Sequence, residues 1–399
     1  MRILMVNKFL YPKGGAENYV FNLGGILKEH GHQVQYFGLY DERNIVGNNA
    51  NSYVSPQDFQ KGIKENITAP FKIIYSTEAR KKIRIVLENF QPDVVHFNNI
   101  QFHLTPSMIL EVNKYRKQTR RNVQIIYTAH DYQLICPSHG LFDTNIHICE
   151  KCLDGNYFYC FSSKCIKNSY AKSLLGMLDA YFWKLNKAYS FIDCIICPSQ
   201  FLKEKLDTQE RFTNKTIVIH NFIDTIKPIQ VKKENYVLEF GHLSRDKGTN
   251  TLLKVCKMLP NIHFVFAGFG SAEKEIDHIQ NAEYVGFKTG KELEMLIRCA
   301  RFSIYPSEWY ENCPLSVLES QMFLTPVIAS RIGGIPELIQ EGVTGELFEP
   351  GNQNDLKNKI EKLWNNPQLL ERYTNNCKRL DKETSESYYE KLISIYSAN

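Results

Sequence analysis

The chain has 399 residues, of which 43% are apolar and 23% charged, with 22 Gly, 15 Pro and a formal net charge of +5. This composition is typical of a folded globular protein and excludes disordered, collagen-like and disulfide-scaffold chains. Because single hydrophobic cores stop growing at roughly 250–300 residues, the length predicts two domains. No apolar run reaches the roughly 18 residues that a membrane-spanning helix needs. Residues 1–7 are also too short an apolar stretch for a secretory leader, so we expect a cytoplasmic protein.

The charge is unevenly distributed. Residues 1–225 hold 27 Lys and Arg against 20 Asp and Glu, whereas residues 226–399 hold 21 against 23. The basic half indicates an anionic partner such as a phospholipid surface, a phosphate-bearing substrate or nucleic acid, and a solvated basic surface is the alternative.

Two segments of this half favour an anionic membrane surface. Basic and apolar residues interleave at 80–86. A second segment places five large apolar side chains on one helical face: Leu174, Leu178, Tyr181, Leu185 and Tyr189. Packing into the core is the alternative for both segments.

The first forty residues predict a βαβ unit. A strand at 3–6 is followed by a loop at 8–14, an amphipathic helix that ends at Gly31, and a strand at 34–39. Further short apolar runs alternate with helical stretches and lie at 94–97, 123–127 and 192–197. This pattern is typical of a parallel sheet covered by helices.

The same pattern restarts after a polar segment at 227–235. A strand at 236–240, a helical stretch around 252–259 and a strand at 263–267 follow in order. The sequence therefore predicts an α/β chain with two Rossmann-like domains.

The stretch 307–319, which follows a strand at 302–305, is the most informative part of the chain. Pro314 predicts that a helix begins near residue 314. Unbonded backbone amides would then point out of the helix start, in a segment that contains Asn312, Cys313, Pro314 and Leu315. Such amides bind anions or sugar hydroxyls.

Two glutamates flank this predicted helix start. Glu311 lies at the mouth of the loop, and Glu319 lies about 7 Å further down the helix at 1.5 Å per residue. That distance suits a second polar group on the same ligand. A chance pair of surface glutamates is the alternative.

Two further strand-to-helix loops carry candidate phosphate-binding groups. In the segment 241–248, glycines allow a close approach of the backbone, and Arg245 and Lys247 bring positive charge to the carboxyl edge of the sheet. A diphosphate fits this chemistry, and a solvated turn is the alternative. In the first loop, Gly14 and Gly15 would let main-chain amides face a phosphate, although such a pair also forms simple tight turns.

Five of the eleven cysteines cluster between residues 136 and 165: Cys136, Cys149, Cys152, Cys160 and Cys165. A Cys-x2-Cys pair is a common half of a tetrahedral zinc site, so we expect a closed structural zinc held by Cys149, Cys152, Cys160 and Cys165. Cys136 is the alternative ligand, and a loop of unpaired thiols is the alternative to a zinc site.

Taken together, these motifs resemble the retaining glycosyltransferases of family 4, which have the GT-B architecture of two Rossmann-like domains facing across a cleft. The resemblance covers nearly the whole chain. It rests on six motifs in chain order: Gly14-Gly15-x-Glu17, Thr128-Ala129-His130-Asp131, Asn221-x-x-Asp224, Lys247-Gly248, Glu311-x7-Glu319 and Ile332-Gly333-Gly334-Ile335-Pro336-Glu337.

The resemblance implies an acceptor-side domain at residues 1–225, with the cysteine-rich insert at 136–165. A nucleotide-sugar-binding domain follows at 226–384. We expect a C-terminal helix at 385–399 that packs back on the first domain.

The resemblance also assigns roles to residues. Lys247 would contact the donor diphosphate, Glu311 and the amides of 312–315 the donor sugar, and Glu319 the ribose. Backbone near Gly286 would read the base. On the other domain, Gly15 backs the phosphate beside Gly14 and Glu17, and His130, next to Asp131, faces the reacting sugar.

One motif departs from the family pattern. His242 stands where members commonly carry Arg, so either Arg245 replaces that charge or the site binds phosphate more weakly and with more pH dependence. The chain contains no Asp-x-Asp. We therefore expect no catalytic metal and expect Lys247, Arg245 and helix N-termini to stabilise the leaving diphosphate.

The function that the resemblance implies is transfer of a hexose-type unit, with retained configuration, from a nucleoside-diphosphate sugar, most simply UDP-linked. The acceptor would be a hydroxyl of a glycan or lipid-linked oligosaccharide in bacterial surface-polysaccharide synthesis. We expect no nucleic-acid partner and a location on the inner face of the membrane.

Three alternatives remain open. They are a nucleotide-sugar epimerase or phosphorylase on the same fold, a non-enzymatic zinc-binding interaction protein, and a nicotinamide-dependent dehydrogenase. The dehydrogenase would use Asp41 as its ribose acid, but the first loop lacks Gly-x-Gly-x-x-Gly.

Overall fold

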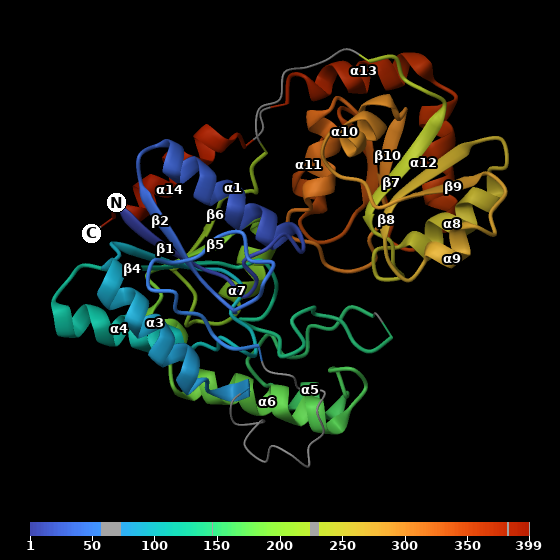
Figure 1. The fold of residues 1–399 in the computed structure, drawn as a ribbon. Helices are drawn as coiled ribbons and strands as arrows, with labels where there is room; N and C mark the ends of the chain where they lie inside the picture. Colours follow the sequence, from blue (N-terminus) through green and yellow to red (C-terminus); the bar gives the residue numbers. More distant parts are fainter. Residues whose placement is uncertain (57–72, 146, 224–230, 381–382, 399) are drawn as a thin grey trace. The chain divides into compact units, whose positions relative to one another are not determined.

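The computed structural model describes residues 1–56, 73–145, 147–223, 231–380 and 383–398, and Figure 1 shows its fold. The chain divides into two compact units. Unit 1 comprises residues 1–220 and 385–399, and unit 2 comprises residues 221–384. The expected boundary between residues 225 and 226 lies outside the described residues. In the part of the chain that the structure describes, no helix has the length and apolar character needed to cross a membrane.

Unit 1 is built on a parallel six-stranded sheet in the order β2-β1-β3-β4-β5-β6. Its strands are β1 (Arg2–Val6), β2 (Gln33–Phe37), β3 (Val94–Phe97), β4 (Gln124–Thr128), β5 (Cys194–Cys197) and β6 (Thr216–Val218). Its helices are α1 (Gly15–Glu29), α3 (Thr77–Phe90), α4 (Ser107–Thr119), α5 (Phe158–Ser162), α6 (Tyr170–Leu185), the 3-10 turn η1 (Ala188–Phe191), α7 (Gln200–Asp207) and α14 (Ser385–Tyr396).

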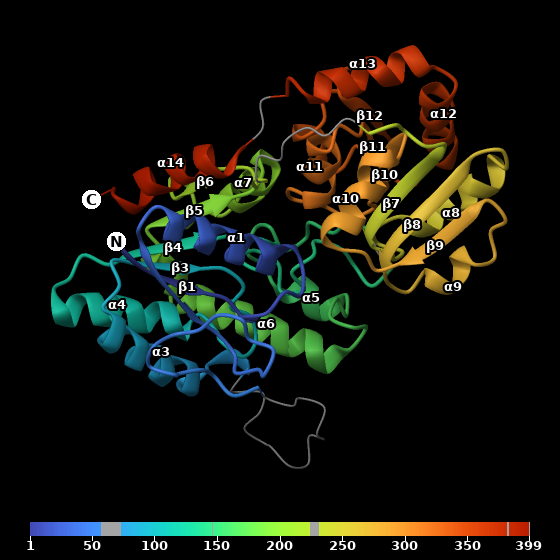
Figure 2. The ribbon, with the colours of Figure 1, turned by 45° about the horizontal axis from the view of Figure 1, so that its top comes forward.

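Helices cover both faces of this sheet, which is why its central strands are continuous apolar runs. Helices α1 and α14 lie together on one face, and α3 and α4 lie together on the other (Figures 1 and 2). The last helix is anchored by buried polar contacts, because the Tyr388 hydroxyl lies 2.5 Å from that of Tyr19 and the Tyr396 hydroxyl lies 2.6 Å from Nδ1 of His96. The C-terminal helix is therefore part of unit 1.

Unit 2 repeats the architecture with strand order β12-β11-β10-β7-β8-β9, again all parallel. Its strands are β7 (Tyr236–His242), β8 (His263–Phe269), β9 (Ala282–Gly286), β10 (Phe302–Tyr305), β11 (Val327–Ser330) and β12 (Gly345–Phe348). Its helical segments are α8 (Thr249–Met258), α9 (Glu273–Ile276), α10 (Gly290–Cys299), α11 (Leu315–Met322), the 3-10 turn η2 (Ile335–Glu337), α12 (Gln353–Trp364) and α13 (Pro367–Cys377).

The core of unit 2 lies on both faces of its sheet. Val237 and Phe264 pack with residues of α8 and α12, whereas their neighbours Leu238 and Val265 pack with residues of α10. This alternation follows from the two-residue period of a strand. Two parallel sheets with interleaved helices confirm the predicted α/β class with two Rossmann-like domains.

Candidate active site

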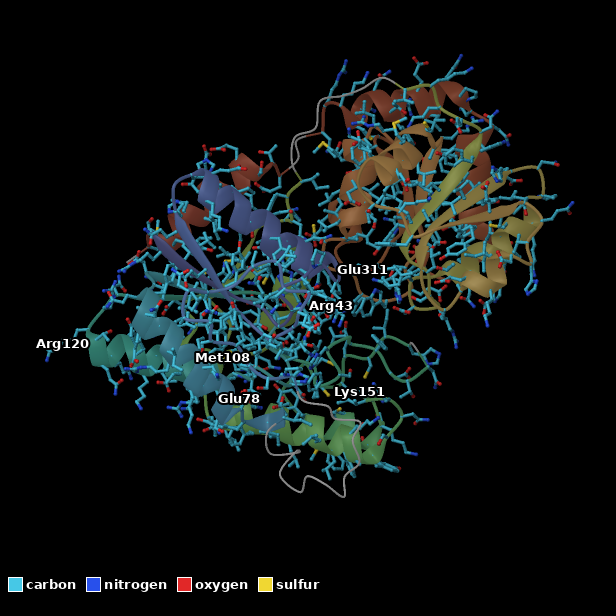
Figure 3. The ribbon with its side chains drawn as sticks, in the orientation of Figure 1. Arg43, Glu78, Met108, Arg120, Lys151 and Glu311 are labelled. Carbon is cyan, nitrogen blue, oxygen red and sulfur yellow. The ribbon has the colours of Figure 1, made fainter. Side chains whose placement is uncertain are left out.

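The loop between β10 and α11 holds a buried carboxylate with four donors. Glu311, labelled in Figure 3, is 8% exposed. All four donors bond to its Oε1: Lys247 Nζ at 2.5 Å, Trp309 Nε1 at 2.5 Å, Tyr305 Oη at 3.0 Å and Ser307 Oγ at 3.0 Å. The other oxygen, Oε2, takes part in none of these contacts. One carboxylate oxygen is thus fixed by the protein, and no hydrogen bond from the described residues to the second is among these contacts.

Lys247 reaches this carboxylate from the neighbouring loop between β7 and α8. Its Nζ also lies 4.4 Å from the centre of the Trp309 ring, so a cation–π contact and an ion pair hold the ammonium group in one place. Gly248 brings the two loops together, because a Cβ at this position would lie 1.8 Å from the carbonyl oxygen of Pro306. Its φ of +77° also favours glycine. The Lys-Gly motif therefore places a cation against the glutamate loop.

The helix that follows begins where the sequence predicts. Pro314 is the N-cap of α11, Leu315 is its first residue, and no described side chain caps it. The loop before it is held by Asn221, whose side-chain amide donates to the carbonyl oxygen of Cys313 at 2.9 Å. The second residue of that hinge motif, Asp224, lies outside the described residues. The first turn of α11 thus presents backbone amides to an anion or hydroxyl ligand.

Glu319 lies within the same helix and is partly exposed. Desolvation by the surrounding protein raises the pKa of its carboxyl to about 7. This carboxyl is therefore only partly ionised near neutral pH. A ligand that donates hydrogen bonds to it would favour the charged form.

Exposed aromatic rings line the carboxyl ends of β7, β8 and β9. The ring of His242 lies 5.3 Å from that of Phe269, which lies 5.4 Å from Phe287. Phe287 follows Gly286, the predicted base-reading position, and is 63% exposed. Arg245 is exposed in the adjacent loop. The position where the family commonly carries Arg thus joins an aromatic row, whose faces suit a planar base.

Unit 1 places a separate set of predicted residues at the carboxyl edge of its own sheet. Gly14 is the N-cap of α1, Gly15 is its first residue, and no side chain among the described residues caps this helix. Glu17 is buried in the first turn and accepts from the side-chain amide of Asn7 at 3.2 Å. Asn7 directly follows β1 and so fixes the loop on which the two glycines lie.

His130 follows β4 and is held in a fixed orientation. Its Nε2 donates to Oδ1 of Asn98 at 2.9 Å, and the ring of Tyr19 packs edge-on against it at 4.9 Å. Desolvation lowers the pKa of His130 to about 4. The imidazole is therefore neutral at physiological pH and presents a polar, uncharged group.

Asp131 is next to His130 in the chain, and its carboxylate accepts hydrogen bonds from the surrounding loops. Its Oδ2 accepts from Gln101 Nε2 at 2.5 Å, and its Oδ1 accepts from the backbone amide of Gln133 at 2.8 Å. His139 lies 4.0 Å from the same carboxylate. These contacts order the turn that carries His130, and any contact of Asp131 with substrate stays a prediction.

Sequence reasoning did not single out several residues that build these sites. Asn7 and Asn98 are the first polar residues after β1 and β3, and Trp309, Ser307 and Tyr305 surround Glu311. Asn7 and Asn98 directly follow buried parallel strands and Tyr305 ends one, and this position is the signal that could have found them. Their hydrogen-bond partners follow only from the tertiary structure.

The predicted zinc site is not supported. Among the residues that the structure describes, no group of three or more His, Cys, Asp and Glu could hold a metal ion. All five clustered cysteines are free thiols: Cys136, Cys149, Cys152, Cys160 and Cys165. Cys152 and Cys160 pack with Tyr157 in an apolar cluster, where burial raises the pKa of the Cys152 thiol to about 12. These protonated thiols act as small core residues.

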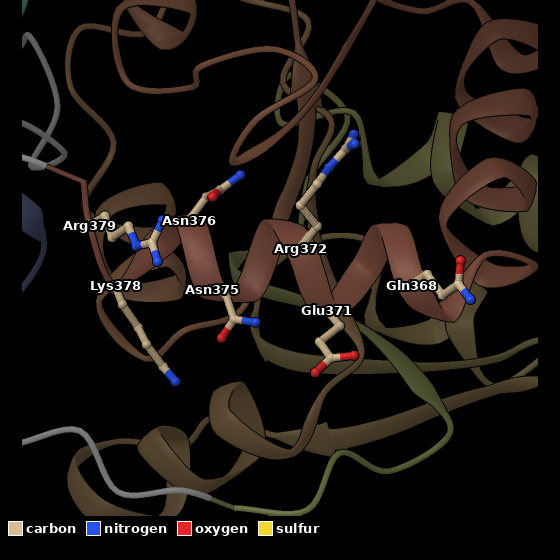
Figure 4. Close-up of a pocket in the computed structure, with 7 residues that line it drawn as sticks. All are labelled: Gln368, Glu371, Arg372, Asn375, Asn376, Lys378 and Arg379. Carbon is tan, nitrogen blue, oxygen red and sulfur yellow. The ribbon is translucent and has the colours of Figure 1, made fainter.

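A surface pocket lies away from these loops, along α13. Figure 4 shows that it is lined by polar and charged side chains such as Glu371, Arg372 and Arg379. None of the predicted donor-site residues lines it.

Two family models match adjoining parts of the chain. The model for Glycosyltransferase Family 4 matches residues 13–227, and the model for Glycosyl transferases group 1 matches residues 222–380. The chain belongs to glycosyltransferase family 4. The predicted family is thereby confirmed.

Curated relatives of this family 4 protein include enzymes and proteins named for polysaccharide loci. An uncharacterized glycosyltransferase of Methanocaldococcus jannaschii is 32% identical over 211 residues, which are 51% of this chain and 58% of the relative. A 42.6 kDa protein in the cps region of Klebsiella pneumoniae is 22% identical over 361 residues, which are 85% of this chain and 87% of the relative. The O-antigen chain mannosyltransferase C of Escherichia coli is 24% identical over 226 residues, covering 52% and 61%. The alignment thus spans less than two thirds of two of these relatives.

Solved structures of the same fold cover the whole chain. Anabaena HepE in complex with UDP superimposes with a TM-score of 0.68 at 17% identity, covering 100% of both chains. Sucrose-phosphate synthase from Thermosynechococcus elongatus gives 0.71 at 16% identity, covering 99% of this chain and 98% of the other. At these identities the likeness shows the fold alone, and it confirms the predicted GT-B fold.

Proposed function

We propose that this family 4 protein transfers a sugar from a UDP-linked donor to a hydroxyl of a glycan or lipid-linked oligosaccharide in surface-polysaccharide synthesis. The relatives from a cps region and from O-antigen synthesis support this class of product. The structural likeness to a UDP complex supports the nucleotide.

The observation that carries the proposal is the arrangement of Lys247 and Glu311. The ammonium group of Lys247 is bonded to one carboxylate oxygen of Glu311. Both groups lie with the start of α11, which has no side-chain cap among the described residues, at the carboxyl edge of one parallel sheet. The ammonium group suits a diphosphate, because it can neutralise the charge that develops on the leaving group. Oε2 of Glu311 and the amides of 312–315 suit the hydroxyls of the donor sugar.

The remaining donor contacts follow from the same unit. Glu319, with its raised pKa, would accept hydrogen bonds from the ribose hydroxyls. Backbone at Gly286 and the rings of Phe269 and Phe287 would contact the base. Arg245 would add charge near the diphosphate, and His242 would contribute there less strongly than an arginine.

On unit 1, neutral His130 would hydrogen-bond the reacting sugar, and the amides behind Gly14 and Gly15 would contact phosphate. His130 needs no charge for this role, which fits its lowered pKa. Glu17 and Asp131 would hold these two loops in place and lie near the substrate.

We further infer a retaining, metal-independent transfer. The bond between the anomeric carbon and the diphosphate oxygen breaks while the acceptor oxygen bonds to the same face of that carbon. The acceptor proton moves to the departing phosphate oxygen. Lys247 and helix N-termini would stabilise the negative charge of the diphosphate in this step.

A panel of nucleotide sugars tests the proposal. Purified protein is incubated with UDP-, GDP- and dTDP-linked sugars, and thermal shift and nucleoside-diphosphate release are measured, with product analysis by anomeric proton coupling. We expect stabilisation by UDP sugars, and UDP release that rises with an acceptor glycan. Sugar interconversion without release would instead indicate an epimerase, and an absence of any donor binding would indicate a non-enzymatic protein.

A further inference from the structure

Helices α5 and α6 form an apolar surface at the edge of unit 1. Both helices lie side by side in Figures 1 and 2. Six large side chains of these helices are exposed: Phe158, Tyr159, Tyr170, Leu174, Leu178 and Leu185. We call these six residues the α5–α6 surface. The burial pattern of α6 is unusual for a domain helix, because only Ser173 and Trp183 are buried.

The leucines of this surface form one stripe. Leu178 lies four residues after Leu174, and Leu185 lies eleven residues after it, close to three full helical turns at 3.6 residues each. Leu185 is 79% exposed. A stripe of exposed leucines on one helix face marks a surface that binds another apolar phase or partner.

Aromatic side chains extend the stripe from α6 to α5. The ring of Tyr170 lies 5.5 Å from that of Phe161, which lies 5.9 Å from Phe158. The ammonium group of Lys164 lies 4.3 Å from the centre of the Tyr170 ring. Aromatic rings and lysines at one apolar surface are the composition of segments that lie in the membrane interface.

The segment that carries the surface is basic. Residues 158–187 contain five lysines: Lys164, Lys167, Lys172, Lys184 and Lys187. Their single acidic residue is Asp179, which accepts from the Trp183 indole at 3.0 Å and whose pKa is raised to about 7 by burial. The carboxyl therefore does not offset the lysines at the surface.

These observations favour an anionic lipid surface over a second copy of the chain. In a two-fold dimer through the α5–α6 surface, this surface of one copy would contact the same surface of the other copy. The lysines of the two copies would then lie close together and repel each other. Anionic lipid headgroups complement the lysines, and acyl chains accommodate the leucines. We propose that the α5–α6 surface docks this protein on an anionic lipid bilayer.

The segment at 80–86, which the sequence also favours for membrane contact, carries less of this role. In α3, Arg80 forms an ion pair with Glu111, and Arg84 forms ion pairs with Glu88 and Glu111. Their charge is thus already paired within unit 1. Tyr189, predicted on the leucine face, is buried in η1 and belongs to the core.

Vesicle cosedimentation of the full chain tests the proposal. We expect binding to phosphatidylcholine vesicles that contain phosphatidylglycerol, release at high salt, and little binding to phosphatidylcholine alone. Replacing the stripe (Leu174→Ser, Leu178→Ser, Leu185→Ser) should lower partitioning by at least roughly tenfold. Changing Lys164, whose ammonium group lies against the Tyr170 ring, and the exposed Lys167 to Ser should lower it by about fivefold per residue.

Two controls match these variants. Ile45→Ser changes an exposed apolar residue elsewhere on unit 1, and Lys114→Ser with Lys117→Ser removes two exposed lysines of α4. Both should bind vesicles as the wild type does, and all variants should keep its thermal melting temperature. Vesicle binding needs no sugar transfer, so its failure would leave the donor chemistry standing.

Three results would overturn the proposal. They are a wild type that ignores anionic vesicles at low salt, a leucine variant that binds them as well as the wild type, and a dimer in solution that the leucine variant converts to a monomer. The last result would assign the surface to a second copy of the chain.

Discussion

Gly333 packs directly on the backbone of Glu311. A Cβ at residue 333 would lie 2.2 Å from the carbonyl oxygen of Glu311, and the neighbouring amide of Gly334 donates to that same oxygen at 2.8 Å. The loop that enters η2 thus fixes the backbone from which the Glu311 carboxylate projects.

Gly333→Ala should displace Glu311 and reduce transfer. The new Cβ would clash with the carbonyl oxygen of Glu311, and alanine disfavours the φ of +59° at this position. We therefore expect a loss of roughly 2–4 kcal/mol in unfolding free energy and a large drop in turnover. Gly342→Ala is the matched control, because its φ is +75° but the nearest atom to its Cβ lies 4.0 Å away. It should cost about 1 kcal/mol and leave turnover unchanged. Equal turnover in both variants would show that Gly333 does not position Glu311.

Lys247→Ala should weaken the diphosphate contact. Removing one fixed donor from a developing negative charge costs roughly a hundredfold in rate, so kcat/KM should fall by about that factor and UDP affinity should fall with it. Lys254→Ala, in the exposed part of α8, is the control and should behave as the wild type. The measurement is steady-state UDP release with parallel UDP titration. Unchanged UDP affinity in Lys247→Ala would remove this residue from the donor site.

Glu319 should make both stability and UDP binding depend on pH. Its folded pKa is raised from 4.5 to about 7, so the folded state keeps a proton that the unfolded state has released, and stability falls as pH rises from 4.5 to 7. The loss is at most about 3 kcal/mol. Glutamine does not ionise, so Glu319→Gln removes this loss of stability. The free energy of unfolding of the variant in urea should exceed that of the wild type at pH 8 and equal it at pH 4.

UDP binding should show the opposite trend, because a carboxylate accepts the ribose hydroxyls better than a carboxylic acid does. Wild-type affinity should rise as pH passes through about 7, and Glu319→Gln should bind more weakly with a flat profile. Glu292→Gln changes an exposed side chain of α10 and serves as the control. It should keep the wild-type dependence of UDP affinity on pH. A wild-type profile that is flat between pH 6 and 8 would argue against a ribose contact.

His130→Ala should lower turnover without changing UDP affinity. Because the pKa of His130 is lowered to about 4, this residue should add no inflection near pH 6.5 to the rate profile of the wild type. His263→Ala, at an exposed position of unit 2, is the control. A wild-type rate that falls with an apparent pKa of about 6.5, and loses that fall in His130→Ala, would show that the imidazole titrates during the reaction.

The sequence predicted helices and strands well where a proline or a continuous apolar run marks the start or extent of an element. Pro314 predicted the start of α11, and the apolar runs at 94–97 and 302–305 coincide with β3 and β10. Parallel strands buried on both faces leave such runs, and the βα loops after them are where polar ligands bind. That is why the Lys247 and Glu311 loops could be singled out before their contact was known.

Tertiary contacts could not be read in the same way. The four donors on Glu311 come from two loops and the end of β10. The partners of Glu17 and His130 are the residues that directly follow β1 and β3. The cysteine spacing suggested zinc because spacing reports distance along the chain, whereas Cys152 and Cys160 pack in an apolar cluster. Whether leucines on α6 face the core or the surface likewise depends on what packs against the helix.

Sugar transfer by a Glu311→Ala variant tests the central claim most directly. UDP release from a UDP sugar that the wild type uses is measured with its acceptor, beside Glu275→Ala, which changes an exposed glutamate of α9. We predict that Glu311→Ala lowers transfer by more than roughly a hundredfold while the protein stays folded, and that Glu275→Ala keeps wild-type turnover. Normal turnover by Glu311→Ala on that verified substrate would contradict the account.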